Sequence, residues 1–208
     1  MQLIAMLTML IDHIGYIFFP QDMAWRYVGR IAFPIYCYAL VQGHLHTSSK
    51  PKYLLRLLLI AVLAQLPYNL ALDPHGLNVV FTLLLSALVL VVLDRFPNPW
   101  LGLIMVAGVS VIMDYFPVDY GAYGLLLVLI YRYTQSYWMV LGHLLLNTFY
   151  LFYSGWVIQM ASLLPTFIIV FVPAFWGHLE KRRVPRIAWW SFYPGHLLIL
   201  ALIKLYSN

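Results

Sequence analysis

The stretch IAMLTMLIDHIGYIFFP, residues 4–20, has the apolar character of a membrane-spanning helix, yet it carries Asp12 and His13 side by side at its middle. An ionisable side chain at the centre of such a helix costs roughly 2.5–3.5 kcal/mol on insertion scales. Two in succession therefore need a structural or a functional reason.

The composition places the chain among membrane proteins. Of its 208 residues, 63% are hydrophobic and only 9% are charged, whereas soluble domains carry about 25% charged residues. A soluble chain of this size has too little interior to bury so much apolar surface. The first segment lacks the basic start and the cleavage site of a signal peptide, so we expect it to remain in the protein.

Apolar segments separated by Pro, Gly, Asp or basic clusters predict an all-α, polytopic integral membrane protein with a single domain, residues 1–208. About nine transmembrane helices are expected, at 2–20, 27–45, 53–71, 77–94, 99–116, 121–133, 137–154, 157–177 and 188–206. The loops after even-numbered helices are basic, and the other loops are acidic with only Arg26 opposing them. This bias predicts a cytoplasmic N-terminus and an extracytoplasmic C-terminus. The basic residues behind the net charge of +5 are spread over these short loops. They therefore indicate the topology of the chain in the bilayer and not a nucleic-acid partner.

His13 lies eleven residues after Gln2, which is nearly three helical turns, so the two side chains share one helix face. Their separation along the helix axis is about 16 Å, from the cytoplasmic end to the middle of the membrane. A long, thin ligand with an anionic head and a reactive far end fits this spacing, and acetyl-coenzyme A has that shape. The alternative is a histidine that hydrogen-bonds to a neighbouring helix.

Asp12 points about 100° away from His13 around the helix, so it need not orient the histidine. Its expected partner is Arg30, about one turn into the second predicted helix, 27–45, which overlaps the stretch GRIAFPIYCYALVQGHLHT, residues 29–47. A buried pair would neutralise both charges, and a catalytic role for Asp12 is the alternative. Pro34 predicts a kink in this second helix.

Basic and imidazole groups gather at the predicted cytoplasmic ends of several helices. Lys52 and Arg56 share a helix face, where they either anchor the chain to anionic headgroups or clamp the phosphates of a nucleotide-like ligand. His44 and His46 either contact phosphate or form a solvated helix end. Their rings point about 200° apart on a helix, and no metal is expected there. His196 either holds the arm of the ligand or satisfies helix packing.

Polar residues at the predicted outer side are candidates for substrate contact. Asn78, Asp119, Tyr120 and Tyr123 are placed to offer hydrogen-bond acceptors to a substrate that bears an amine. The alternative is that they are turn residues and members of an interfacial aromatic belt.

Six blocks of sequence occur in an order that resembles a known family: IAMLTMLIDHIGYIFFP, GRIAFPIYCYALVQGHLHT, KYLLRLL, LNVVFTLLL, DYGAYG and FYPGHLLIL. Together they resemble the TraX family, named for the conjugal-transfer protein that acetylates the N-terminus of F-type pilin. The resemblance runs from residue 3 to about residue 200.

The TraX family in turn looks like a compact member of the transmembrane acyl transferase superfamily. That group includes the type-3 membrane acyltransferases and lysosomal heparan-α-glucosaminide N-acetyltransferase. The type-3 enzymes carry a basic residue, ten intervening residues and a histidine in their first helix. His13 matches that histidine, whereas Gln2 stands in place of the basic residue. Lys52 and Arg56 resemble the arginine-rich cofactor site of that group.

The resemblance implies an acetyltransferase of the bacterial inner membrane. Acetyl-coenzyme A enters from the cytoplasm, and the acetyl group leaves to an extracytoplasmic acceptor such as a pilin or another secreted or membrane peptide. His13 is the expected base or acetyl carrier, with Asp12 and Arg30 shaping the site. The expected contacts to acetyl-coenzyme A are Gln2, His44, His46, Lys52, Arg56 and His196.

Two further hypotheses remain open. The chain is either a small transporter that uses Asp12, His13 and Arg30 as a proton or ion relay, or a non-catalytic membrane scaffold of a secretion or conjugation apparatus. The transporter predicts flux across vesicles and no binding of coenzyme A. The scaffold predicts that substituting both His13 and Arg56 leaves function intact.

Overall fold

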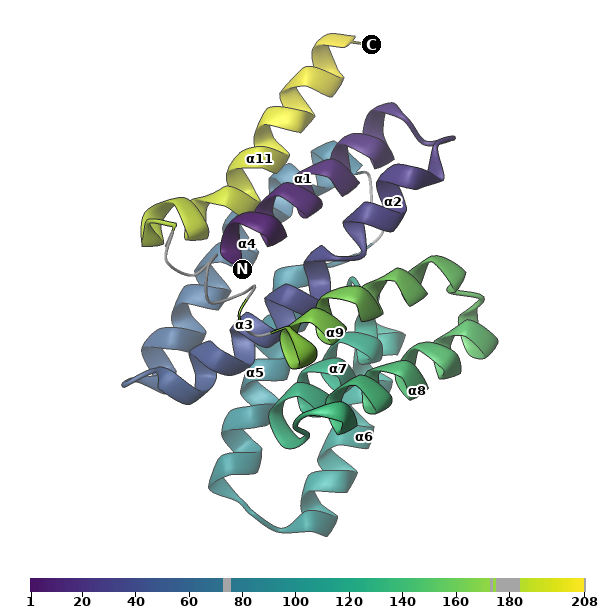
Figure 1. The fold of residues 1–208 in the computed structure, drawn as a ribbon. Coiled ribbons are helices and arrows are strands. Elements are labelled where there is room, and N and C mark those ends of the chain that lie inside the picture. The colour runs from purple at the N-terminus through teal and green to yellow at the C-terminus, as the bar shows by residue number, and fades with distance from the viewer. Residues whose placement is uncertain (73–75, 173, 175–183, 208) are drawn as a thin grey trace.

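A computed structural model describes residues 1–72, 76–172, 174 and 184–207, and every regular element within them is helical (Figure 1). The helices, in chain order, are α1 (Gln2–Phe18), α2 (Met23–Gly29), α3 (Ala32–His46), α4 (Lys50–Leu72), α5 (Val79–Arg95), α6 (Pro99–Tyr115), α7 (Gly121–Tyr133), α8 (Tyr137–Ser154), the 3₁₀ helix η1 (Val157–Ser162), α9 (Leu163–Phe171) and α11 (Arg186–Ser207). The all-α prediction is therefore confirmed for this part of the chain.

The second predicted helix, 27–45, is wrong as a single element. The chain forms α2 and α3 instead, with Arg30 and Ile31 between them. Pro34 lies in the first turn of α3, where a backbone N–H has no intrahelical acceptor to lose. The proline therefore sits at the start of a helix and does not kink its middle. Arg30 lies at a break in the chain, close to α1.

Two other predicted helices also differ in detail. The range 157–177 begins as η1 and continues as α9 to Phe171, and most of its remainder falls outside the described residues. The last helix, α11, begins two residues before the predicted range and ends one residue after it, and it continues through Pro194 without interruption. The other predicted ranges agree with the observed helices to within three residues.

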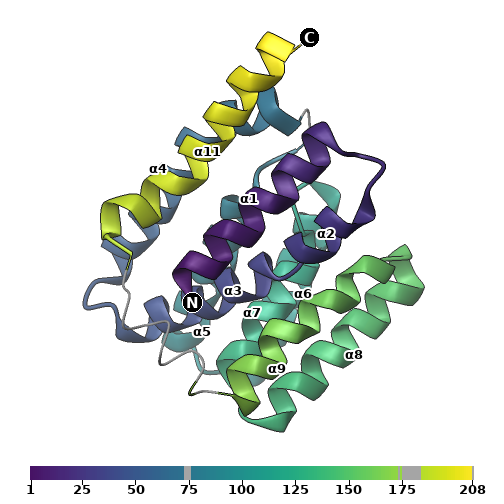
Figure 2. The ribbon, with the colours of Figure 1, turned by 45° about the horizontal axis from the view of Figure 1, so that its top comes forward.

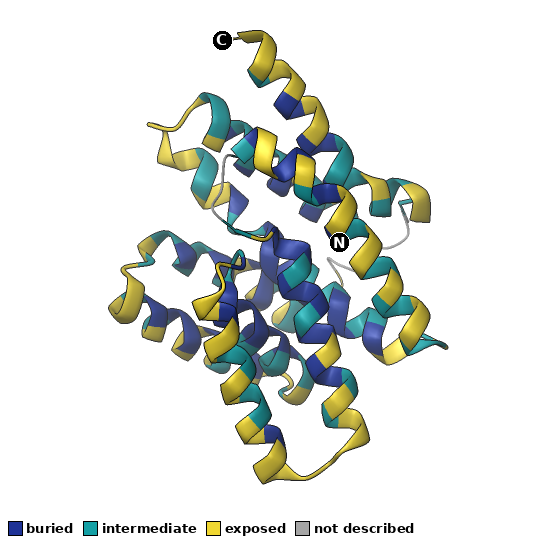
Figure 3. Cartoon of the chain, turned by 180° about the vertical axis from the view of Figure 1, so that it is seen from behind, coloured by how far each residue is buried: buried dark blue, intermediate teal, exposed yellow. Residues whose placement is uncertain are grey.

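The centre of the fold is α3. It packs against α1, α5, α7 and α9, and four of its side chains, Phe33, Ile35, Cys37 and Val41, are no more than 2% exposed. Figure 2 shows α4 and α11 side by side at one edge of the molecule and α8 and α9 at the other, with α1 and α3 between these pairs. The buried residues accordingly gather in the middle of the molecule (Figure 3).

The outward helix faces are apolar. On α4, Leu59, Val62, Leu63 and Leu66 are 52–67% exposed, and their spacing places them on one stripe. Contiguous exposed apolar surface of this kind is typical of a helix that faces lipid or a partner. By length and composition, α4 and α11 are the described helices that suffice to cross a membrane, and the other apolar helices of the described chain are shorter.

Candidate functional site

A cavity of about 210 Å³ lies beside the middle of α1. Its polar wall comes from α1, from α2 and the break that follows it, from α4, and from the loop before α7: Asp12, His13, Tyr16, Arg26, Arg30, Tyr68, Asp119 and Tyr120. The three residues that the sequence analysis assigned to chemistry, Asp12, His13 and Arg30, therefore line one cavity.

Asp12 holds two arginines in this wall. Its carboxylate lies 2.9 Å from Nη1 of Arg26 and 3.3 Å from Nη2 of Arg30. The predicted Asp12–Arg30 pair is confirmed, whereas Arg26 had counted only as a charge of the outer loop. Gly29 makes the contact possible, because a Cβ at this position would lie 1.9 Å from Oδ1 of Asp12. Any larger residue there would push the carboxylate away from both guanidinium groups.

His13 contacts a second histidine. Its Nδ1 lies 2.8 Å from Nε2 of His196, which is 183 residues away in the chain. Nδ1 of His196 lies 2.6 Å from the carbonyl oxygen of Phe192, one turn earlier on α11. The ring of His196 is almost fully buried, at 6% exposure. The sequence leaves open whether His196 holds the arm of the ligand or satisfies helix packing, and the structure places it against the predicted reactive histidine.

Asp119 and Tyr120 enter the cavity from a loop that is fixed to the start of α5. The amide of Asp119 donates to the carbonyl of Leu77 at 2.9 Å, and the hydroxyl of Thr82 donates to the carbonyl of Asp119. Burial raises the pKa of the Asp119 carboxyl to about 6. Tyr120 adopts a left-handed backbone conformation, with φ of 65°, and its ring stacks on Phe33 at 3.8 Å between centroids. Both predicted substrate contacts therefore face the cavity.

Asn78 and Tyr123 have structural contacts instead. Asn78 caps α5, because its Oδ1 accepts from the amide of Val80 at 3.0 Å while its Nδ2 donates to the carbonyl of Ala61 at 2.8 Å. Tyr123 is fully buried, and its hydroxyl lies 3.0 Å from Nε2 of His143. The structure corrects their predicted role in substrate binding, since both polar groups are satisfied by packing between helices.

A second cavity, of about 270 Å³, opens at the N-terminal end of α4 and is lined by Gln2 and Arg56. The guanidinium of Arg56 lies between two aromatic rings, 5.8 Å from the centroid of Tyr53 and 5.2 Å from that of Trp190. The rings restrict the guanidinium by cation–π contact and leave its N–H donors for a ligand. Gln2 and Arg56, predicted to share a ligand, do lie at one cavity.

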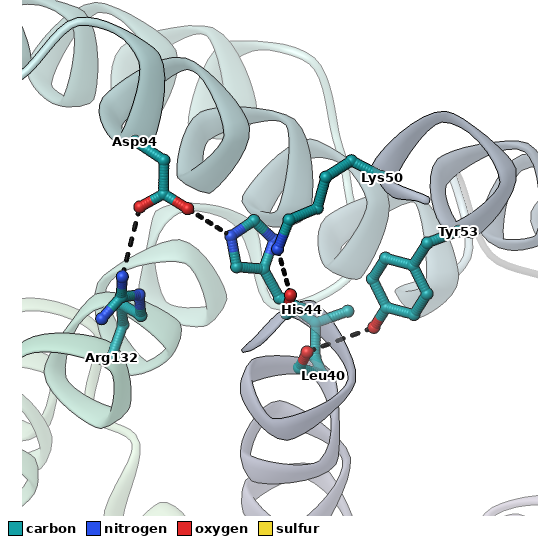
Figure 4. A network of polar contacts seen from close by, with 6 residues as sticks. All are labelled: Leu40, His44, Lys50, Tyr53, Asp94 and Arg132. Carbon is teal, nitrogen blue, oxygen red and sulfur yellow. Dashed lines mark hydrogen bonds and ion pairs between the residues drawn. The ribbon is translucent and has the colours of Figure 1, made fainter. Parts of the chain in front are cut away.

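The other basic and imidazole groups predicted at the cytoplasmic helix ends, His44, His46 and Lys52, lie outside this cavity. His44 is fully buried, with its Nε2 2.7 Å from Oδ2 of Asp94, and Asp94 also accepts from Arg132 at 3.2 Å (Figure 4). Lys50 donates to the carbonyl of His44 in the same network. This network ties together the ends of α3, α4, α5 and α7, so the predicted contact of His44 with a phosphate is replaced by a structural one.

His46 and Lys52 are exposed at the same end of the molecule. Nδ1 of His46 lies 2.8 Å from the carbonyl oxygen of Gln42, within its own helix. Neither side chain is part of the wall around Arg56. Within the described chain, no three His, Cys, Asp or Glu side chains converge to hold a metal ion.

The cavity at Arg56, a small cavity, the cavity at His13 and a larger one form a row in which each shares wall residues with the next. A narrow cavity of about 80 Å³ shares Met9, Phe33 and Val79 with the cavity at His13. The same narrow cavity also shares walls with the one at Arg56, namely Tyr36, Leu57, Ile60, Leu83, Trp189 and Trp190. On the far side of His13 lies a wide cavity of about 560 Å³, and its shared walls are Arg26, Arg30, Asp119 and Tyr120. The cavity at His13 thus shares walls with a small apolar cavity, here called the passage, and with a larger cavity of mixed polar and apolar lining, here called the mouth.

Comparison with known proteins gives a family match and a relative that each cover nearly the whole chain. The model of the TraX protein family matches residues 1–204. A probable fimbrial assembly protein FimC, serogroup H1, from Dichelobacter nodosus is 29% identical over 236 aligned positions, which cover 99% of this chain and 95% of that protein. No solved structure matches the chain. Since the family match spans nearly every residue, the chain belongs to the TraX family.

Proposed function

We propose that this protein is a membrane-embedded acetyltransferase that moves an acetyl group from cytoplasmic acetyl-coenzyme A to an extracytoplasmic acceptor, the N-terminal amine of a pilin or of another peptide. The observation that carries the proposal is the row of cavities from Arg56, past His13, to the wide mouth at Arg26 and Asp119. Membership of the TraX family and similarity to a protein named for fimbrial assembly favour a pilin as the acceptor.

In this proposal the chain crosses the bacterial inner membrane several times, with its N-terminus in the cytoplasm. The apolar outward faces support contact with lipid, and α4 and α11 have the required length. The ends of α3, α5 and α7 and the start of α4 meet in the network around His44. These ends carry the basic residues that mark a cytoplasmic side, and the same side holds the cavity at Arg56.

Acetyl-coenzyme A would occupy the cavity at Arg56 and the small apolar cavity beside it. Arg56 offers planar, bidentate contacts to phosphate, and Gln2 shares its cavity. The narrow cavity is lined by Met9, Phe33 and Leu83 together with other apolar and aromatic residues. The thin arm of coenzyme A would run through this passage and carry the thioester toward His13.

The chemistry at His13 takes one of two routes. In the first, His13 accepts the proton of the acceptor amine while the amine nitrogen bonds to the thioester carbonyl and the thiolate of coenzyme A leaves. In the second, His13 itself bonds to the carbonyl carbon and the thiolate leaves; the amine nitrogen then bonds to that carbon, the bond to the imidazole breaks, and the released imidazole nitrogen takes the proton of the amine. Both routes need one ring nitrogen with a free lone pair that faces the cavity.

The relay hypothesis is less well supported by the same row of cavities. A proton pathway needs polar groups or water along its length. The narrow cavity between Arg56 and His13 is lined by Met9, Phe33, Val79 and further residues of the same apolar and aromatic kind, which favours an organic ligand over an ion path.

The test is acetyl transfer itself. The purified chain in lipid vesicles is incubated with isotope-labelled acetyl-coenzyme A and with peptides that begin with a pilin-like N-terminus, and the peptides are then weighed by mass spectrometry. We expect one acetyl group on the N-terminal amine, and none on a matched peptide whose amine is blocked. If no peptide gains label and the chain binds no coenzyme A, the proposal fails, and proton or ion flux across the same vesicles would favour the relay.

Arg56 is predicted to act on donor binding and not on the chemical step. Arg56→Gln removes a charge-assisted contact worth about 1.5–3 kcal/mol, so the KM for acetyl-coenzyme A should rise about 10-fold to 100-fold while kcat changes little. Arg95→Gln, a matched change at the exposed end of α5, should leave both constants unchanged. A fall in kcat with an unaltered KM would place Arg56 outside the donor site.

A further inference from the structure

The hydrogen bonds of His196 define which of its ring nitrogens carries the proton. A backbone carbonyl can only accept, and Nδ1 of His196 lies 2.6 Å from the carbonyl oxygen of Phe192. Nδ1 must therefore be the donor. A neutral imidazole has one donor and one acceptor nitrogen, so Nε2 of His196 is the acceptor.

The same argument assigns the proton on the ring of His13. Its Nδ1 lies 2.8 Å from the acceptor nitrogen of His196, so Nδ1 of His13 carries the proton. The lone pair of His13 is then on Nε2. Among the described residues the hydrogen bond of the His13 ring is the one that Nδ1 makes to His196, so Nε2 is left for a ligand, and His13 lines the cavity between donor passage and acceptor mouth.

The ring of His196 is held in place on several sides. It lies nearly parallel to the ring of Phe192, at 15° and 4.5 Å between centroids, and edge-on to Tyr193 at 5.7 Å. It is nearly coplanar with His13, at an interplanar angle of 7°. The helix that carries it, α11, packs along α4 and against α1. His196 therefore presents a fixed acceptor to His13.

We propose that His196 is a positioning residue that holds His13 in the tautomer with a proton on Nδ1, and that Nε2 of His13 is the reacting atom. The inference rests on the proposed acetyl transfer. By the base route, Nε2 takes the proton released as the N–C bond forms and the C–S bond breaks. By the acetyl-histidine route, Nε2 bonds to the carbonyl carbon as the thiolate leaves; when the amine then bonds to that carbon, the bond to Nε2 breaks and Nε2 takes the proton of the amine. Either way Nδ1–H stays bonded to His196.

Two substitutions separate positioning from packing. His196→Leu keeps an apolar side chain in place but removes the acceptor, and we expect kcat to fall about 100-fold, at the lower end of the range for acid–base catalysis. His196→Gln keeps an oxygen that can accept from His13 and should retain most of the rate. Ser191→Ala on the same helix, which removes only a bond to the carbonyl of Ile187, should behave like the unmodified chain.

The second readout does not depend on activity. Nitrogen NMR of the chain labelled with ¹⁵N-histidine distinguishes protonated from unprotonated ring nitrogens, and the signals of His13 are identified by their loss in His13→Gln. We expect a protonated Nδ1 and an unprotonated Nε2 at His13 in the unmodified chain and in His196→Gln. In His196→Leu the preference should disappear.

The outcomes separate this inference from the proposed function. If the unmodified chain transfers acetyl, but His196→Leu keeps its rate within about twofold or His13 carries its proton on Nε2, the role of His196 is overturned and the activity stands. If the unmodified chain transfers no acetyl, the proposed function fails, while the NMR signals still report whether His196 controls the tautomer. Should His196→Leu not fold, His196→Gln and the unmodified chain still decide the question.

Discussion

A His13→Gln chain folds normally and loses at least about 100-fold of its acetyl-transfer rate, the expected consequence of removing a general base or nucleophile. The glutamine amide can still donate to His196 and fill the space of the imidazole, but its nitrogen has no lone pair for the acceptor proton or the acetyl group. The measurement is the initial rate with labelled acetyl-coenzyme A at saturating peptide, together with the thermal unfolding curve of the purified chain.

The matched control for this variant is Thr8→Val, on the same helix. It is nearly isosteric and removes only the hydroxyl, which donates to the backbone carbonyls of Ile4 and Ala5 within its own helix, away from the cavity wall. We expect its rate to equal that of the unmodified chain. A His13→Gln chain that turns over at the normal rate would remove His13 from the mechanism, whichever of the two routes is correct.

We expect Asp12→Asn to lower the free energy of unfolding by about 3 kcal/mol, because removing one member of a buried ion pair leaves the other charge uncompensated. Here two guanidinium groups, of Arg26 and Arg30, lose their shared carboxylate. Their side chains are only 26% and 15% exposed, so water replaces the carboxylate poorly. Unfolding by heat and by denaturant in mild detergent measures the loss.

Asp22→Asn provides the comparison. Asp22 is exposed and caps α2, with its Oδ1 accepting from the amide of Ala24 at 3.0 Å, and asparagine caps a helix about as well as aspartate. The same change of carboxylate to amide should therefore alter stability by less than about 0.5 kcal/mol. An Asp12→Asn chain that is equally stable would mean that the two arginines do not depend on Asp12.

Local sequence was sufficient for the parts of the site that lie on one helix or on neighbouring segments. Asp12 and His13 stand out because ionisable residues are costly in an apolar segment. Arg30 follows as a partner, since a charge of opposite sign nearby lowers that cost. The same local reasoning overlooked Arg26 and took Pro34 for a kink, because the break between α2 and α3 depends on where a helix starts in three dimensions.

The polar groups at the predicted cytoplasmic helix ends could not be told apart from local sequence. His44, Lys52 and Arg56 look alike in the sequence, as polar groups at helix ends. In the folded chain His44 forms a hydrogen bond with Asp94, which lies fifty residues later in the sequence. Arg56 instead lies against the rings of Tyr53 and Trp190. Composition and spacing carry no information about such distant partners.

The apolar composition and the helical period were enough to establish an all-helical chain, the ranges of most helices and the unusual position of His13. Which nitrogen of His13 faces the cavity depends on the fold, because α11 returns to α1 and brings His196 within 2.8 Å. The physical reason is that helix formation is governed by neighbours three and four residues apart. A hydrogen bond across 183 residues exists only once the packing of the helices has brought the two rings together.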